Sequence, residues 1–199
     1  MRTLIAALSL SLVSSLSFAG TVSVTDTKSI TKAGQSFTFS FPSLPKTGTD
    51  GLLSIVLNGD FSGTVDNEYA TLTLDSLSGS ADLGNYGNSS KDGFSNIGNN
   101  RIKELTLESY GIKKFSSNDT EQSWTFSLTD AALTSILKDS TFTITLANNA
   151  NVNILHESNP DFVKVGLSYT STDVPEPGSL ALFGLGLAGA AAIARRRRA

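Results

Sequence analysis

Cysteine is absent from the 199-residue chain, and histidine, tryptophan and methionine occur once each. The lack of cysteine excludes a disulfide-stapled fold, a thiol-dependent enzyme and a cysteine-ligated zinc site. His156 is the only histidine, and no G-x-S-x-G or H-E-x-x-H pattern occurs, so neither a serine-hydrolase motif nor a zincin site is visible. We therefore predict a protein that is not an enzyme. A glycosidase-type carboxylate pair stays open, because two Asp or Glu residues suffice for it and no spacing identifies them.

Positive charge is scarce between residues 20 and 174, where 10 Lys and Arg stand against 17 Asp and Glu and give a net charge of −7. This balance lacks the positive surplus that phosphate contacts require, so we predict no nucleic-acid partner. The whole chain is 39% hydrophobic and has only 17 Gly and 5 Pro, which argues against disorder and against a collagen-like chain. Residues 20–174 are enough for one globular domain.

The first 19 residues have the layout of a secretory signal peptide. Met1 and Arg2 give a positive start, residues 4–16 are mostly apolar, and Ser17 and Ala19 are the small residues typical of the cleavage site. About 13 apolar residues are too few to span a bilayer core roughly 30 Å thick. We predict removal of residues 1–19 by signal peptidase, with cleavage after Ala19, and export of the domain that follows.

The last 25 residues combine a proline-bounded motif, an apolar segment and a block of basic residues. Pro175, Glu176 and Pro177 precede the uncharged residues 178–194, whose 17 residues would form a helix about 25 Å long, near the minimum for a membrane span. Arginines are costly to move across a bilayer, so the basic block should stay in the cytoplasm and the domain should face outward. The block consists of Arg195, Arg196, Arg197 and Arg198.

This tail resembles the PEP-CTERM sorting signal of Gram-negative bacteria that produce exopolysaccharide. The motif, the apolar span and the arginine block stand in the order typical of that signal, behind a signal peptide. The resemblance implies recognition by an exosortase, a membrane cysteine protease that cuts near the Pro-Glu-Pro motif at 175–177. It also implies transient anchoring in the inner membrane with the domain in the periplasm, followed by transfer to the cell surface or the extracellular matrix. An ordinary single-span anchor with a proline-containing stalk is the alternative.

The middle of the chain alternates apolar residues with Thr and Ser, a period of two that is typical of strands with one buried face. The clearest runs cover residues 37–41, 124–128, 142–146 and 163–169, and the continuous apolar run at 52–57 suggests a central strand. Seven to ten strands separated by Gly, Asn and Asp turns predict an all-β fold, an antiparallel β-sandwich of the jelly-roll or immunoglobulin-like kind. Trp124 and the phenylalanines of these runs should lie in the core.

Weaker patterns complete the secondary-structure prediction. Val22 with Val24, and Val152 with Ile154, indicate edge strands. Thr129 or Asp130 can cap one short helix, whose apolar side at helical spacing would consist of Leu133, Ile136 and Leu137.

Several oxygen-bearing side chains follow the predicted central strand. Asp60, Asp66 and Glu68, with Asn67 and Asp75 nearby, have the oxygen atoms that Ca²⁺ takes as ligands. The spacing matches no EF-hand loop, and Asp, Asn and Gly are also the residues of a β-turn, so both interpretations stay open. Calcium is the one cofactor that the sequence suggests.

Residues 78–100 are rich in Gly and Asn and contain two aromatic residues, Tyr86 and Phe94. We predict a long loop, and loops of this length are usually functional or disordered. An aromatic face beside planar polar groups suits the C–H face and the hydroxyl edge of a sugar, which makes Tyr86 and Phe94 candidate carbohydrate-binding residues. The alternative is a surface loop without a ligand.

The two terminal signals around a polar domain without catalytic motifs predict an exported structural or adhesive protein of the cell surface or the exopolysaccharide matrix of a biofilm. A carbohydrate-binding module, assisted by calcium or not, is the alternative function, and a polysaccharide hydrolase is a weaker third.

Overall fold

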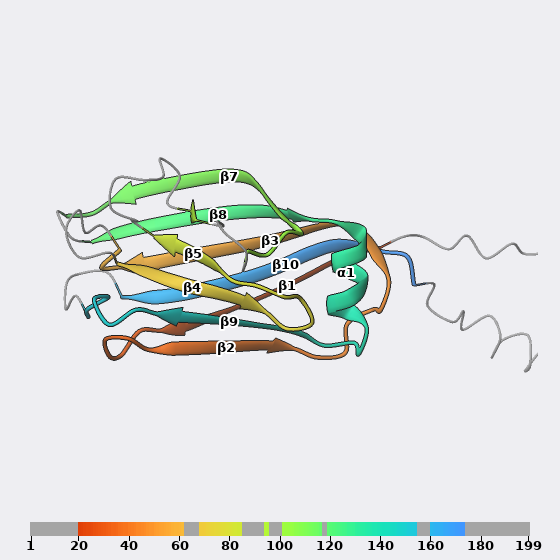
Figure 1. The fold of residues 1–199 in the computed structure, drawn as a ribbon, viewed down its shortest axis with the longest axis horizontal. Coiled ribbons are helices and arrows are strands. Elements are labelled where there is room, and N and C mark those ends of the chain that lie inside the picture. Colours follow the sequence, from red (N-terminus) through yellow and green to blue (C-terminus); the bar gives the residue numbers. More distant parts are fainter. Residues whose placement is uncertain are drawn as a thin grey trace, which may run out of the picture. The chain divides into compact units, whose positions relative to one another are not determined.

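The computed structural model describes residues 20–61, 68–84, 94–95, 101–116, 119–154 and 160–173, with residues 94–95 described by their backbone alone. These residues form ten strands and one helix, shown in Figure 1. In chain order the elements are β1 (Gly20–Ser29), β2 (Ser36–Phe41), β3 (Gly48–Gly59), β4 (Tyr69–Leu74), β5 (Ala81–Gly84), β6 (Phe94–Ser95), β7 (Leu105–Lys114), β8 (Thr120–Leu128), α1 (Asp130–Leu137), β9 (Phe142–Asn148) and β10 (Phe162–Ser171).

The strands form two five-stranded sheets, ordered β1-β10-β3-β8-β7 and β2-β9-β4-β5-β6, and all neighbouring strands are antiparallel. The pairing is nested: the first strand lies beside the last, β2 beside β9, and β3 beside β8. This order is that of a jelly roll. The prediction of an all-β sandwich is confirmed, and of the two kinds left open the jelly roll is the one observed.

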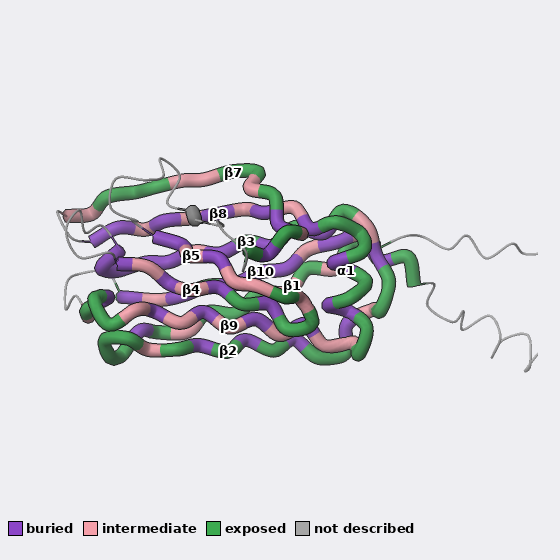
Figure 2. Tube along the Cα trace, in the orientation of Figure 1, coloured by how far each residue is buried: buried purple, intermediate pink, exposed green. Residues whose placement is uncertain are grey.

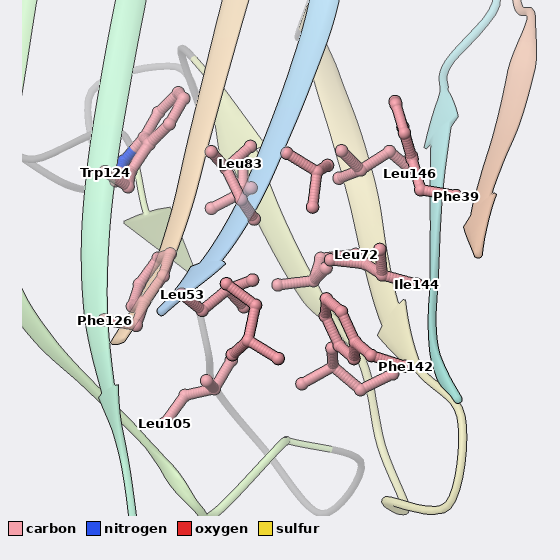
Figure 3. Close-up of a cluster of buried hydrophobic side chains, with 14 of the residues drawn as sticks. Phe39, Leu53, Leu72, Leu83, Leu105, Trp124, Phe126, Phe142, Ile144 and Leu146 are labelled. Carbon is pink, nitrogen blue, oxygen red and sulfur yellow. The ribbon is translucent and has the colours of Figure 1, made fainter. Parts of the chain in front are cut away.

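The core lies between the two sheets because successive residues of each strand point to opposite sides. Along β8 buried and half-buried residues alternate without interruption, and Figure 2 shows the same alternation along most strands. Phe39, Trp124 and Phe126 are almost completely buried, as predicted. Figure 3 shows Trp124 and Phe126 reaching inward from one sheet toward the side chains of the other, among them Leu72, Ile144 and Leu146. Burial of each such side chain contributes about 1.5 to 3 kcal/mol, so the core forms without disulfides.

The helix α1 begins as predicted. The Thr129 hydroxyl accepts a hydrogen bond from the backbone N–H of Ala132 at 3.2 Å, which caps the first turn. The buried side of the helix contains Ala132 together with the three predicted residues Leu133, Ile136 and Leu137. The helix closes one end of the sandwich, on the right in Figure 1, and contacts β3 and β9.

Two local predictions are wrong. Residues 78–100 do not form one loop, because β5 and β6 lie within them and extend the second sheet beyond β4. Val152 and Ile154 do not form an edge strand. Val152 is buried, but its N–H donates to the carbonyl of Asn149 at 3.3 Å, so the backbone turns after β9 instead of pairing with another strand.

The signal peptide at 1–19 and the tail from residue 174 onward lie outside the described residues. Within the part of the chain that is described, no helix is long and apolar enough to cross a membrane. The predicted membrane helix at 178–194 therefore stays a prediction.

Candidate functional site

The two ends of the sandwich differ in chemistry. At one end, here called the α1 end, β1 begins at Gly20 and β10 finishes at Ser171, and these two residues are register partners. At the opposite end, here called the polar end, β3 and β9 finish and β4, β8 and β10 begin. Among the described residues nine polar side chains are buried, and eight of them lie at this polar end: Asn58, Asp60, Glu68, Asp119, Thr120, Gln122, Asn148 and Asp161.

Hydrogen bonds of the polar end fix the chain as it leaves or enters the strands. The Asn58 side-chain amide donates to the carbonyl of Pro160 at 2.8 Å, and that of Gln122 donates to the carbonyl of Phe61 at 2.6 Å. The Ile30 N–H donates to the carbonyl of Asp161 at 2.9 Å. Buried polar groups need such partners, so these contacts explain several of the buried side chains by structure alone.

The predicted calcium ligands are only partly described. Asp60 and Glu68 are each 5% exposed and lie at the polar end, one after β3 and one before β4. Asp66 lies outside the described residues. No group of three or more acidic, histidine or cysteine side chains that could hold a metal occurs in the described ranges. The structure thus brings two of the three residues to one end, and calcium binding stays a prediction.

The predicted carbohydrate residues are not described as side chains. Tyr86 lies outside the described residues. Only the backbone of Phe94 is described; it belongs to β6 and pairs with Leu83 of β5. His156, the only histidine, also lies outside the described residues.

An open groove of about 700 Å³ lies on the outer face of the first sheet at the α1 end, a volume within the range of ligand sites. β3, β7, β8 and the start of α1 line it. Leu52 is 41% exposed there and is one of two large apolar side chains that are exposed among the described residues. The polar lining residues are Asp50, Glu108, Thr125, Ser127, Thr129 and Asp130.

Two backbone irregularities bring carboxylates to this groove. Glu108 is the extra residue of a β-bulge, since Leu107 pairs with Phe126 and Ser109 with Thr125. A bulge redirects a side chain that would otherwise follow the strand, and the Ser127 hydroxyl donates to Glu108 Oε1 at 2.5 Å. Asp50 has a φ of 58°, a left-handed conformation that Asp adopts more readily than most residues. The groove therefore presents hydrogen-bond acceptors around an apolar floor.

The described chain ends in a cluster of hydrogen bonds around Asp173. Its carboxylate accepts from the backbone N–H groups of Lys46 and Thr47, the latter at 3.2 Å, and from the Thr47 hydroxyl. The Thr172 N–H donates to the carbonyl of Thr47 at 3.1 Å, and the two threonine hydroxyls are 2.8 Å apart. These contacts tie the end of the domain to the connection between β2 and β3.

The same cluster shifts two pKa values. The hydrogen bond from the Thr47 hydroxyl, aided by the two backbone N–H groups, lowers the pKa of Asp173 below its ordinary value of 3.8. Burial raises the pKa of Tyr169 to about 12, and the negative charge of Asp173 adds to that effect. The Tyr169 hydroxyl donates to the carbonyl of Pro45 at 3.0 Å, so it belongs to the same connection.

By its fold, the described part of the chain is an antiparallel β-sandwich with jelly-roll strand order. The end of the chain is more informative about function than the fold. Residues 173–198 match the family model of the PEP-CTERM protein-sorting motif. The chain therefore carries a PEP-CTERM sorting motif, as the sequence predicts, and such a motif implies an exported protein with a C-terminal sorting tail that an exosortase processes. The match begins at Asp173, the last residue of the described domain. No curated protein and no solved structure matches the chain.

Neither the groove nor the Asp173 cluster was identified from the sequence. Asp173 lies 126 residues from Thr47, and no spacing pattern connects the two. One sequence signal could have indicated the groove. Residues 53, 55 and 57 of the strand point inward, so Leu52 has to point outward and expose an apolar side chain.

Proposed function

We propose that this protein is a non-enzymatic structural or adhesive component of the cell surface or of the exopolysaccharide matrix. It is exported, held in the inner membrane by its tail with the domain in the periplasm, and released by exosortase cleavage near Pro175-Glu176-Pro177. The single observation that carries this proposal is the sorting-motif match at 173–198, which begins at the last described residue of the jelly-roll domain.

The outer faces of the sheets support a role among polysaccharides. Along β2, β8 and β9 the outward residues are almost all Ser and Thr, for example Thr38 and Thr145, whose hydroxyls lie 3.1 Å apart across two strands. Hydroxyl groups both donate and accept hydrogen bonds, so such faces can contact a hydroxyl-rich polymer without requiring charge complementarity.

Fractionation of producing cells tests the proposed destination. The wild-type chain should be found in the surface or matrix fraction, whereas a variant with Pro175, Glu176 and Pro177 all changed to alanine should remain in the inner-membrane fraction at full length. Equal recovery of both proteins from the matrix would overturn the proposal.

The groove favours carbohydrate binding as a second candidate function. A sugar ring can place its C–H face on Leu52 while its hydroxyls donate to the carboxylates of Asp50, Glu108 and Asp130. Calcium-assisted binding would need the polar end instead, where Asp60 and Glu68 lie. The two sites are at opposite ends of the sandwich and can be tested separately.

Two exposed apolar residues provide a matched test of the groove. Leu52→Ser should weaken binding of purified matrix polysaccharide, measured by sedimentation of the protein with the polymer. Ile112→Ser is the control, because Ile112 is 49% exposed on β7 and does not line the groove. Unchanged binding by Leu52→Ser, or an equal loss by both variants, would exclude the groove as the sugar site.

A further inference from the structure

The sorting motif starts very close to the folded domain. Asp173 is held by the domain, and Pro175 follows two residues later. An extended chain covers at most about 3.6 Å per residue, so Pro175 can lie no more than about 7 Å from the last fixed residue. A protease that binds its substrate as an extended strand needs several free residues before the bond that it cuts, whereas only Val174 separates Asp173 from Pro175.

The contacts that hold Asp173 lie on the surface, whereas those just before them do not. Lys46, Thr47, Thr172 and Asp173 are all exposed, so water can replace their hydrogen bonds when they break. Ser171 is only 5% exposed and pairs with Gly48 in the sheet. Opening can therefore release Thr172 and Asp173 and stop at Ser171, without disturbing the core.

Gly48 lets β3 and β10 approach each other closely at that point. A Cβ atom at residue 48 would lie 2.4 Å from the ring of Tyr169 and 2.8 Å from the carbonyl oxygen of Thr170. The β3 backbone thus approaches β10 more closely than a side chain would allow. The release of two residues doubles the free distance to Pro175, from about 7 Å to about 14 Å.

We propose that the contacts of Asp173 and Thr172 with Lys46 and Thr47 form a clamp, the Asp173 clamp, whose opening limits the rate at which the exosortase cuts the tail. This inference rests on the proposed exosortase processing. Thr47 and Asp173 are positioning residues in this account: they act on the access of the protease to the motif and take no part in bond cleavage.

A pair of threonine variants tests the clamp in the full-length chain. Thr47→Val removes the hydroxyl that bonds Asp173 and Thr172 and lies far from the motif in sequence. Thr49→Val is the matched control, because the Thr49 hydroxyl donates to Asp50 at 3.0 Å and not to the clamp. In pulse-chase experiments Thr47→Val should be processed roughly two- to tenfold faster than wild type, because the closed state loses two water-exposed hydrogen bonds, each with a small net contribution. Thr49→Val should be processed at the wild-type rate.

An insertion provides an independent test that does not depend on the folding of Thr47→Val. Four residues, Gly-Ser-Gly-Ser, placed between Asp173 and Val174 supply the free length without opening the clamp. This variant should be processed faster than wild type, and the addition of Thr47→Val to it should give no further acceleration. The C-terminal peptide of the mature protein should have its wild-type mass in Thr47→Val and in Thr49→Val. This measurement distinguishes processing at the normal site from degradation.

Three results would overturn the clamp: processing of Thr47→Val at the wild-type rate, processing of the insertion variant at the wild-type rate, or the same acceleration by Thr47→Val with and without the insertion. The triple alanine variant at 175–177 separates this failure from failure of the sorting proposal. If that variant blocks processing while the clamp variants have no effect, the clamp alone is wrong. If it is processed like wild type, the sorting proposal is wrong as well.

Discussion

Tyr169 shows how one side chain connects the core to the end of the domain. The residue is 1% exposed, its ring lies against Gly48, and its hydroxyl donates to the carbonyl of Pro45. Because burial raises the pKa of this phenol to about 12 from an ordinary value of 10.0, the neutral form is favoured in the folded protein. Tyr169 therefore links the stability of the domain to alkaline pH.

We predict that Tyr169→Phe changes the pH dependence of the unfolding free energy. In wild type the folded state keeps the tyrosine proton longer than the unfolded state, so stability from this group is complete below pH 10 and is lost as pH rises through about 12. The variant lacks the titrating group. Denaturant unfolding of residues 20–173 between pH 9 and 12 measures the difference in unfolding free energy between wild type and variant. All other titrating groups are common to both proteins, so their contributions drop out of this difference. Parallel curves for the two proteins would contradict the assignment.

Individual core residues were predictable from the sequence, and individual site residues were not. Trp124 and Phe126 could be assigned to the core because strict alternation with Thr and Ser fixes the side of the strand on which they lie. The contact between Asp173 and Thr47 depends on how β10 and the β2–β3 connection meet, which no local pattern encodes.

At the scale of elements, α1 depends on a single capping hydroxyl. The helix has eight residues, shorter than helices that are stable in isolation, so its stability comes from the cap and from its buried side against β3. Thr129 supplies the cap.

We predict that Thr129→Ala lowers the unfolding free energy by about 1 kcal/mol, the usual cost of losing an N-cap. Thr134→Ala is the control in the same helix. Its hydroxyl donates to the carbonyl of Asp130 at 2.8 Å, a contact that does not stabilise helices, so this change should stay within about 0.5 kcal/mol. Urea denaturation of both variants gives the values, and equal losses would show that Thr129 has no special role.

Element predictions succeeded where both the period and the turn residues agreed. The strands β2, β8, β9 and β10 have four or more regularly alternating residues, and each was predicted. β5 has only four residues in a Gly- and Asn-rich context, so its local sequence resembles a loop, and pairing with β4 makes it a strand. The partner and register of each strand are tertiary properties, which is why the jelly roll could not be separated from the immunoglobulin-like order beforehand.

At the scale of the whole molecule, the nested strand order places both chain ends of the domain together. Gly20 and Ser171 are register partners at the α1 end. The described chain therefore begins and finishes at the same end of the sandwich. The polar end, with Asp60 and Glu68, lies at the far side of the sandwich from these two points.

The sorting motif was the feature related to function that the sequence predicted best. Sorting tails are read as a linear order of motif, span and charge, so the order of residues suffices, and the match at 173–198 confirms the sorting motif. A binding role depends on side chains that converge from distant strands, as in the groove around Leu52, and this arrangement appears only once the fold is known.

The most direct test of the central claim is mass spectrometry of the intact mature protein recovered from the cell surface or matrix. Cleavage by the signal peptidase and the exosortase predicts a chain that begins at Gly20, finishes near Pro175-Glu176-Pro177 and lacks Arg195 to Arg198. A surface-recovered chain that still carries all four arginines would contradict the claim that the tail is a processed sorting signal.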